Sequence, residues 1–273
     1  ASSYKMRLRC TLLTLSVLSH RGLALRTNPF LSKPIRFASV ISMMSTDEPA
    51  SKKPKLIPAS IKIYYWNMSF WRADTLRAAL YLQGIPFENC TGRDQMDELK
   101  AQKKVPFGAF PVMDIDGKIL SQTQACATFV GKLTNLYPSN DDPFAQANCD
   151  EIINGCTDVT GTISATFRGV ADKKSAREKL IDPKDGRLYM HMNGLNSVVC
   201  KDGSEFACGK DTGLTVADLA VWRLCNWFTC GSLDHIPTNW IESNFSNIKK
   251  IYDNVESNEK IQAFKKEYYP DKK

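Results

Sequence analysis

The fold of this chain is decided by the stretch Val105-Pro106-Phe107-Gly108-Ala109-Phe110-Pro111-Val112-Met113-Asp114-Ile115-Asp116-Gly117-Lys118-Ile119-Leu120-Ser121-Gln122-Thr123. A loop leads to Pro111, and the apolar run that follows it is typical of a strand. Asp116-Gly117 is a dipeptide favoured in two-residue hairpin turns, so 118–120 is predicted to return as the partner strand. Polar groups at 121–123 precede a helix predicted from Gln124 to Leu133. Together these features favour a pocket for a peptide-like, anionic ligand.

Upstream, the sequence predicts a strand, a helix, a second strand and a short polar helix. Their expected ranges are 61–66, 72–83, 85–90 and 96–104. The first strand is β-branched and aromatic, and Gly84 stands where a left-handed helix cap belongs. Pro86 limits pairing of the second strand, which favours the edge of the sheet. Strand–helix–strand order predicts a parallel pair with a right-handed crossover, to which the hairpin adds antiparallel strands. The order βαβαββα therefore predicts an α/β domain over 61–136 with a mixed four-stranded sheet.

Downstream, a linker rich in Pro, Ser, Asn and Asp spans 137–143, and an all-α domain is predicted over 144–270. Apolar residues recur at helical spacing over 145–167, and further helical segments cover 175–180 and 186–199. Thr215-Val216-Ala217-Asp218 is a capping box: the Thr215 hydroxyl and the Asp218 carboxylate are expected to accept from free backbone N–H groups. Another core helix is predicted to follow it.

Residues 1–60 carry most of the chain's excess positive charge. They hold ten basic and two acidic residues, so the remainder has a net charge of −1, against +7 for the whole chain. A nucleic-acid partner is therefore not expected. The basic leader contains no acidic residue before Asp47, a pattern typical of an organelle transit peptide, for a mitochondrion or a plastid, followed by a disordered linker. Met43 or Met44 would start a shorter cytoplasmic form. The leader has no apolar run as long as the ~18 residues of a membrane span.

The nine cysteines and three histidines give no metal-binding pattern. No pair of cysteines has CxxC spacing, and His191 and His235 lack a Cys or His partner at ligand spacing. We expect buried, reduced thiols and no structural metal.

Three motifs resemble those of the glutathione transferases and are most similar to the sigma class. They are Tyr65-Trp66-Asn67-Met68 followed by Arg72-Ala73-Asp74, the loop from Val105 through Pro111-Val112, and Leu120-Ser121-Gln122-Thr123. The resemblance covers about 61–270. It implies a thioredoxin-like N-terminal domain, an all-α C-terminal domain and a homodimer. It also implies an enzyme of detoxification or glutathione metabolism, in which the glutathione thiolate attacks a small hydrophobic electrophile.

The resemblance also implies roles for particular residues. The Tyr65 hydroxyl would donate a hydrogen bond to the sulfur of glutathione, which favours the nucleophilic thiolate. Phe110 and Pro111, joined by a cis peptide bond, would offer backbone groups to the cysteinyl unit. Gln122 and Thr123 would bind the γ-glutamyl carboxylate, since a helix N-terminus favours anions. Simple helix capping is the alternative for this last pair.

Three further residues carry weaker predictions. Arg72 aligns with a family arginine near the thiolate, although it also fits an exposed position at a helix start. Lys100 is a candidate partner for the glycyl carboxylate, in competition with Lys103 and Lys104. Asp158, with Asp150 as the fallback, aligns with a family aspartate that reaches the glutathione amine across a dimer interface.

Two departures from the family pattern leave the electrophile unassigned. The turn at Ser69-Phe70-Trp71 is one residue longer than usual and is expected to lie over the thiol site, with the electrophile near Phe70, Trp71 and the 145–167 helix. Ala109 replaces the usual Gln or Lys. A non-catalytic carrier or structural protein is therefore an alternative, as is a sigma-like isomerase or peroxidase. A thiol–disulfide enzyme ranks last because 65–72 contains no cysteine.

Overall fold

The computed structural model describes residues 57–270. Almost all of the expected leader, with its targeting segment, lies outside these residues. Within them, no helix is both long and apolar enough to cross a membrane.

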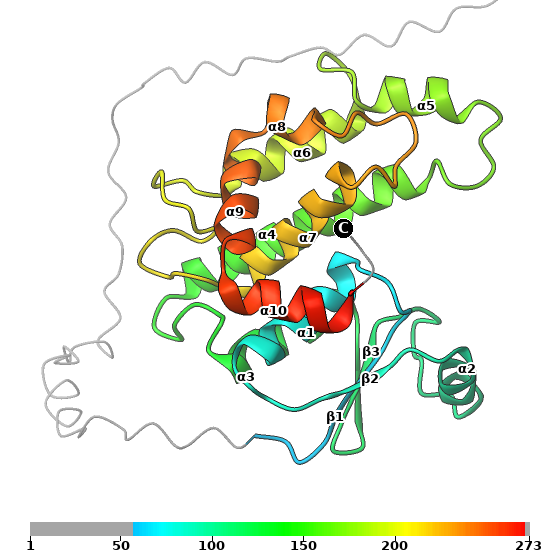
Figure 1. Cartoon of the computed structure of the whole chain (residues 1–273), viewed down its shortest axis with the longest axis vertical. Coiled ribbons are helices and arrows are strands. Elements are labelled where there is room, and N and C mark those ends of the chain that lie inside the picture. Colours follow the sequence, from blue (N-terminus) through cyan, green and yellow to red (C-terminus); the bar gives the residue numbers. More distant parts are fainter. Residues whose placement is uncertain (1–56, 271–273) are drawn as a thin grey trace, which may run out of the picture. The chain divides into compact units, whose positions relative to one another are not determined.

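The N-terminal part contains a mixed four-stranded sheet and three helices (Figure 1). The elements are β1 (Ile61–Tyr64), α1 (Trp71–Leu82), β2 (Glu88–Cys90), α2 (Arg93–Ala101), β3 (Val112–Ile115), β4 (Lys118–Ser121) and α3 (Thr123–Thr134). The strand order is β2-β1-β3-β4, with β1 parallel to β2 and antiparallel to β3. The predicted element order, the parallel pair and the edge position of the second strand are confirmed. The sheet also carries the predicted thioredoxin-like topology.

The hairpin forms as its turn residues predict. Val112 pairs with Ser121 and Ile115 with Lys118, which leaves Asp116-Gly117 as the two-residue turn. Both turn residues have positive φ, at 50° and 82°, as a type I′ turn requires. The Asp116 carboxylate accepts from the Ser60 backbone N–H at 2.8 Å, so the chain just before β1 is held against this turn.

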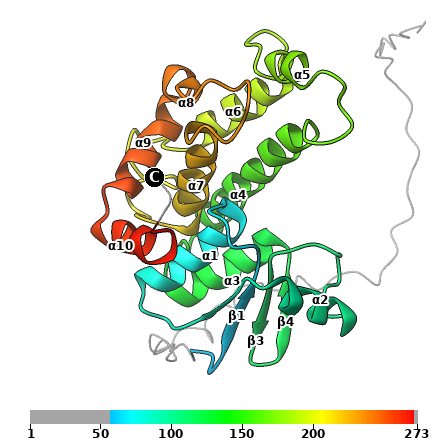
Figure 2. The same cartoon turned by 45° about the vertical axis from the view of Figure 1, so that its right-hand side comes forward.

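Helices α1 and α3 lie together between the sheet and the C-terminal helices, whereas α2 lies apart from them (Figures 1 and 2). The alternation along β1 explains this arrangement. Ile61 and Ile63 are buried, while Lys62 and Tyr64 point to the other face, where they share a polar hollow with residues of α2.

Within residues 57–270, all of the secondary-structure elements after α3 are helices, as predicted. The helices are α4 (Pro143–Ser164), α5 (Lys173–Leu180), α6 (Arg187–Val198), α7 (Val216–Thr229), α8 (Trp240–Asn244), α9 (Ser246–Glu256) and α10 (Glu259–Tyr268). Helix α7 is buried along most of its length and packs on α1, α4 and α9. One hydrophobic core therefore runs from the sheet through α1 into the helical part.

Several predicted boundaries are wrong in detail. The helix expected at 96–104 begins at Arg93, since Gly92 and Gln95 form its N-terminal capping interaction, and it ends at Ala101. The helix expected at 145–167 begins at Pro143, because the Asp142 side chain caps it, and it ends at Ser164. In the capping box at α7, the Asp218 carboxylate accepts from the Thr215 backbone N–H at 2.8 Å. The capping box is therefore present as predicted, and the Thr215 hydroxyl also donates to that carboxylate at 2.7 Å.

Candidate functional site

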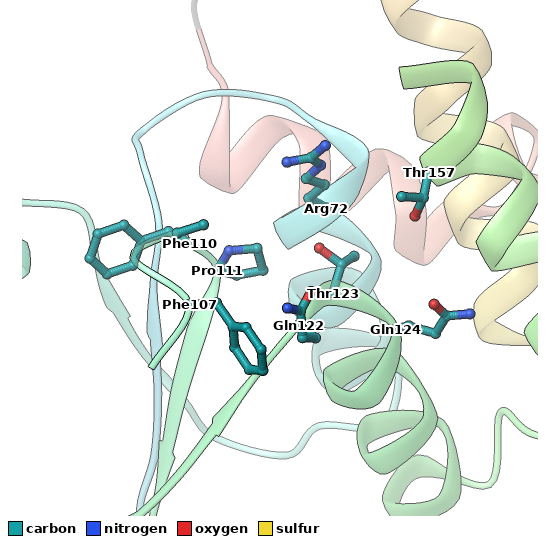
Figure 3. A pocket seen from close by; sticks show the side chains of 9 residues that line it. Arg72, Phe107, Phe110, Pro111, Gln122, Thr123, Gln124 and Thr157 are labelled. Atoms are coloured by element: carbon teal, nitrogen blue, oxygen red, sulfur yellow. The ribbon is translucent and has the colours of Figure 1, made fainter. Parts of the chain in front are cut away.

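A pocket lies where the loop before β3, the N-terminus of α3 and one side of α4 meet (Figure 3). The residues that line it are Arg72, Phe107, Ala109, Phe110, Pro111, Gln122, Thr123, Gln124 and Thr157. Five of these were predicted as site residues from the sequence: Arg72, Phe110, Pro111, Gln122 and Thr123. The tertiary structure thus brings together the predicted backbone-binding loop, the predicted carboxylate site and the predicted arginine.

The loop reaches the pocket through the Phe110–Pro111 peptide bond, which is cis, as the resemblance implies. Phe110 also contacts two neighbours outside the pocket lining. Its ring meets Trp66 edge-on at a centroid distance of 5.9 Å, and the Lys100 ammonium lies 5.6 Å from its centroid. The loop is therefore flanked by the turn after β1 on one side and by α2 on the other.

The N-terminus of α3 is uncapped by side chains. Gln122 is the N-cap residue, but its side chain makes no capping hydrogen bond. Its backbone has φ 73° and ψ 118°, a conformation that is strained for a residue with a Cβ. Thr123 makes no side-chain hydrogen bond to another residue within 57–270. The first N–H groups of α3 and these two side chains are therefore available to an anion in the pocket, and simple capping does not explain them.

Arg72 supplies the one charged side chain among the described residues that line the pocket. It lies in the first turn of α1, and Thr157 on α4 faces the N-terminus of α3 from the opposite side (Figure 3). The nearest partner described for the Arg72 guanidinium is the Phe70 ring, 6.0 Å away. A cation and a helix N-terminus thus face the same space, and both favour an anionic ligand.

Tyr65 lies directly after β1 and is only 5% exposed, and it does not line this pocket. Burial raises the pKa of the Tyr65 phenol to about 12, although the positive charges of Arg72 and Arg77 act to lower it. The phenol is therefore protonated at neutral pH and can donate a hydrogen bond. Among the residues described, no group accepts a hydrogen bond from it.

Lys100 and Asp158 lie outside the pocket. The Lys100 ammonium pairs with Asp97 at 2.9 Å while it lies beside Phe110. Its competitor Lys104 lines the polar hollow under α2. Asp158 is exposed in a groove between α4 and α6. The fallback residue Asp150 joins α4 to α3, because its carboxylate accepts from the Thr128 hydroxyl at 2.9 Å and its carbonyl oxygen from Gln124.

The two aromatic residues of the long turn are buried. Phe70 is 7% exposed and meets Trp227 of α7 edge-on at 4.9 Å. Trp71 is fully buried in the first turn of α1, and its indole N–H donates to the Thr160 hydroxyl of α4 at 2.8 Å. These rings fill the junction between the sheet layer and the helices and do not line the pocket beside Arg72.

Sequence reasoning missed four lining residues. Phe107 and Ala109 belong to the quoted loop and were available from it, and Gln124 follows the predicted carboxylate pair. Thr157 had no local signal, because it is one threonine in a long helix. Within residues 57–270 there is also no cluster of His, Cys, Asp and Glu able to hold a metal ion. The eight cysteines in this range are all free thiols, six of them buried.

Comparisons with known proteins add to this geometry. Residues 157–268 match the family model for the glutathione S-transferase C-terminal domain. Glutathione S-transferase 1 of Ascaris suum is 28% identical over 158 residues, which are 55% of this chain and 72% of that protein. A glutathione S-transferase of Anopheles gambiae is 23% identical over 74% of this chain and 94% of its own length. These matches support the glutathione S-transferase superfamily.

Solved structures agree with the transferase fold. Prostaglandin synthase D of Nilaparvata lugens superposes with a TM-score of 0.60 at 26% identity, over 75% of this chain and 96% of that one. The glutathione S-transferase of Ascaris lumbricoides gives a TM-score of 0.61 at 22% identity, over 77% and 97%, which shows the fold alone. The thioredoxin-like sheet domain followed by an all-α domain is therefore the glutathione S-transferase arrangement.

Proposed function

We propose that this protein is a glutathione transferase, in which the glutathione thiolate attacks a small hydrophobic electrophile. One observation carries the proposal: the cis-Pro111 loop and the uncapped N-terminus of α3 open into one pocket beside Arg72. Glutathione is an extended tripeptide with two carboxylates and a thiol. Backbone groups at Phe110 suit its peptide unit, and the N–H groups of α3 suit its γ-glutamyl carboxylate.

The proposed chemistry needs a thiolate near neutral pH. Arg72 would favour the charged sulfur through its positive charge, and the protonated Tyr65 phenol would donate a hydrogen bond to it. No metal is needed for this step. The sigma class, detoxification and an organelle destination remain parts of the proposal that rest on the motifs and on the leader.

A non-catalytic ligand carrier is the second candidate. It is favoured by the low exposure of Tyr65 and by its absence from the pocket lining. Calorimetry with glutathione and an assay of its conjugation to a chromogenic electrophile separate the two. Binding with turnover supports the transferase, binding without turnover supports a carrier that holds glutathione, and no heat at millimolar glutathione contradicts the transferase and favours a non-catalytic protein.

The carboxylate site predicts a specific loss of affinity. Thr123→Val removes the hydroxyl and keeps the β-branched shape, so we expect glutathione to bind about 10- to 100-fold more weakly, as for one lost hydrogen bond to a charged group. Isothermal titration calorimetry measures the change. Thr238→Val is the matched control, because Thr238 is exposed and far from the lining residues. Equal affinity in Thr123→Val and wild type would remove Thr123 from the carboxylate site.

The groove between α4 and α6 supports the proposed homodimer. It exposes Met190, which is 58% accessible, together with Asp158, and the half-buried Val198 also lines it. Light scattering is expected to give about twice the chain mass of 30.6 kDa. Met190→Glu should shift the protein to the monomer mass at micromolar concentration, since it places a charge in an apolar contact. Val170→Glu, in the loop after α4, is the control. A monomeric wild type would contradict both the dimer and the proposed role of Asp158.

A further inference from the structure

A buried charged cluster joins α1, α7 and the C-terminal end of the described chain. Asp74 and Arg77 of α1 are fully buried, Arg223 of α7 is 3% exposed, and Tyr269 follows α10. The Arg77 guanidinium lies 3.1 Å from one Asp74 oxygen, and the Arg223 Nε lies 2.9 Å from the other. This second contact is a charge contact, because its angle is not that of a hydrogen bond. The Tyr269 hydroxyl donates to Asp74.

The same cluster holds the turn that follows Tyr65. Arg77 donates to the Trp66 carbonyl oxygen at 3.3 Å and to the Met68 carbonyl oxygen at 3.4 Å. The Tyr269 hydroxyl accepts from Arg77 at 3.0 Å and lies 3.3 Å from the Met68 carbonyl oxygen. The Arg77 guanidinium also lies 5.9 Å from the centre of the Tyr65 ring.

The turn also has an internal backbone contact, since the Met68 N–H donates to the Trp66 carbonyl oxygen at 2.8 Å. Trp66 and Met68 are 43% and 38% exposed, so their side chains do not anchor it in the core. Its far end is fixed separately, since Phe70 and Trp71 are buried against α7 and α4. Arg77 and Tyr269 therefore supply the side-chain polar contacts that join the backbone next to Tyr65 to α1 and to the end of α10, and a bidentate guanidinium is well suited to fix two carbonyl groups at once.

We propose that Arg77 and Tyr269 are positioning residues that tie the C-terminal end of the chain to the turn after Tyr65 and so set the Tyr65 hydroxyl for the glutathione sulfur. The inference rests on the proposed transferase function. Neither residue touches the substrate. Arg77 holds the two carbonyl groups, Asp74 orients Arg77, and Tyr269 bonds to both members of that pair. Arg223 balances the Asp74 charge from α7.

Tyr269→Phe is the sharpest variant, because it removes one hydroxyl and keeps the ring that packs near Arg223 and Phe264. Conjugation kinetics are expected to show kcat about threefold to tenfold lower, the effect of one lost hydrogen bond, with KM for glutathione changed less than twofold. The acid limb of the pH–rate profile should move to higher pH, since a displaced Tyr65 stabilises the thiolate less.

Two further variants sharpen the test. Tyr268→Phe is the matched control: Tyr268 ends α10, stacks on Phe87, and has no hydroxyl hydrogen bond within residues 57–270. It should behave as wild type in rate and pH profile. Arg77→Lys keeps the charge but cannot hold both carbonyl groups, so its loss of kcat should exceed that of Tyr269→Phe. Wild-type kinetics in Tyr269→Phe, or an equal loss in Tyr268→Phe, would overturn the inference.

Hydrogen exchange separates this inference from the proposed function. Peptides that contain residues 66–69 should exchange faster in Tyr269→Phe than in wild type or Tyr268→Phe, whether or not the protein conjugates glutathione. If the wild type is inactive but shows this exchange pattern, the transferase function and the positioning of Tyr65 for catalysis are rejected. The hold of Arg77 and Tyr269 on the turn is then still supported. Unchanged exchange in Tyr269→Phe would show that Tyr269 does not hold the turn, and would reject the inference.

Discussion

Tyr65→Phe is expected to lower the rate of glutathione conjugation at neutral pH by roughly 10- to 100-fold, the effect of removing one hydrogen bond to a charged group. The phenol is suited to this role because burial raises its pKa to about 12, so it stays a donor over the range in which a thiol ionises. Without it, the thiol pKa of bound glutathione should rise. The loss should therefore be largest at low pH and recover as the pH increases, with the acid limb of the pH–rate profile displaced by about one unit.

The neighbouring strand residue supplies the control for this prediction. Tyr64 has the same side chain one position earlier in β1, and it points to the opposite face of the sheet, into the polar hollow under α2. Tyr64→Phe is expected to keep the wild-type rate and pH profile. Steady-state kinetics across pH, with glutathione and a chromogenic electrophile, compare the three proteins. A Tyr65→Phe enzyme as fast as wild type would show that another group stabilises the thiolate.

Asp218→Ala is expected to lower the free energy of unfolding by about 3–5 kcal/mol, the range for removing a buried charged acceptor from its partners. The carboxylate is fully buried and accepts from the Thr215 N–H and hydroxyl, and also from the Ala207 N–H at 2.6 Å. Its loss leaves these donors buried without a partner. It also removes the N-terminal cap of α7, on which α1, α4 and α9 pack. Denaturant unfolding followed by circular dichroism measures the change.

The pH dependence of stability gives a second readout for Asp218. Burial raises its pKa to about 6, above the ordinary 3.8, although its hydrogen bonds oppose the shift. Between these two values the folded state holds a proton that the unfolded state releases. This group's contribution to stability therefore falls as the pH rises through that window. Asp218→Asn should abolish that component. Asp211→Ala, in the exposed loop before α7, should change neither stability nor its pH dependence. If it lowers the free energy of unfolding as much as Asp218→Ala does, the effect comes from the loop and not from the cap.

Local rules were sufficient where neighbouring residues determine the backbone. Asp116-Gly117 specifies a turn with two positive φ angles, and the alternating burial along β1 follows from its sequence. The motifs in the loop to Pro111 and in the polar residues before α3, through their resemblance to the glutathione transferases, likewise predicted four of the lining residues. Each of these features depends on contacts a few residues apart, which a sequence displays directly.

Local rules failed where a residue's surroundings come from a distant element. The packing of Phe70 on Trp227 and the hydrogen bond from Trp71 to Thr160 were not predicted. The hydrogen bond from the Tyr269 hydroxyl to Asp74 could not be predicted either, since the two residues are far apart in the sequence. Nothing in the immediate sequence of either group identifies its partner.

Two adjacent residues on α4 show most clearly which features the sequence determines and which depend on the tertiary structure. The sequence by itself determined that Thr157 and Asp158 lie on a long helix, since apolar residues recur there at helical spacing. Successive helical residues point about 100° apart, so only one of them can face a given neighbour. Thr157 faces the pocket and Asp158 faces the α4–α6 groove. Only the tertiary structure decided this, because the packing of α4 against α6 and α7 sets the rotation of the helix about its axis.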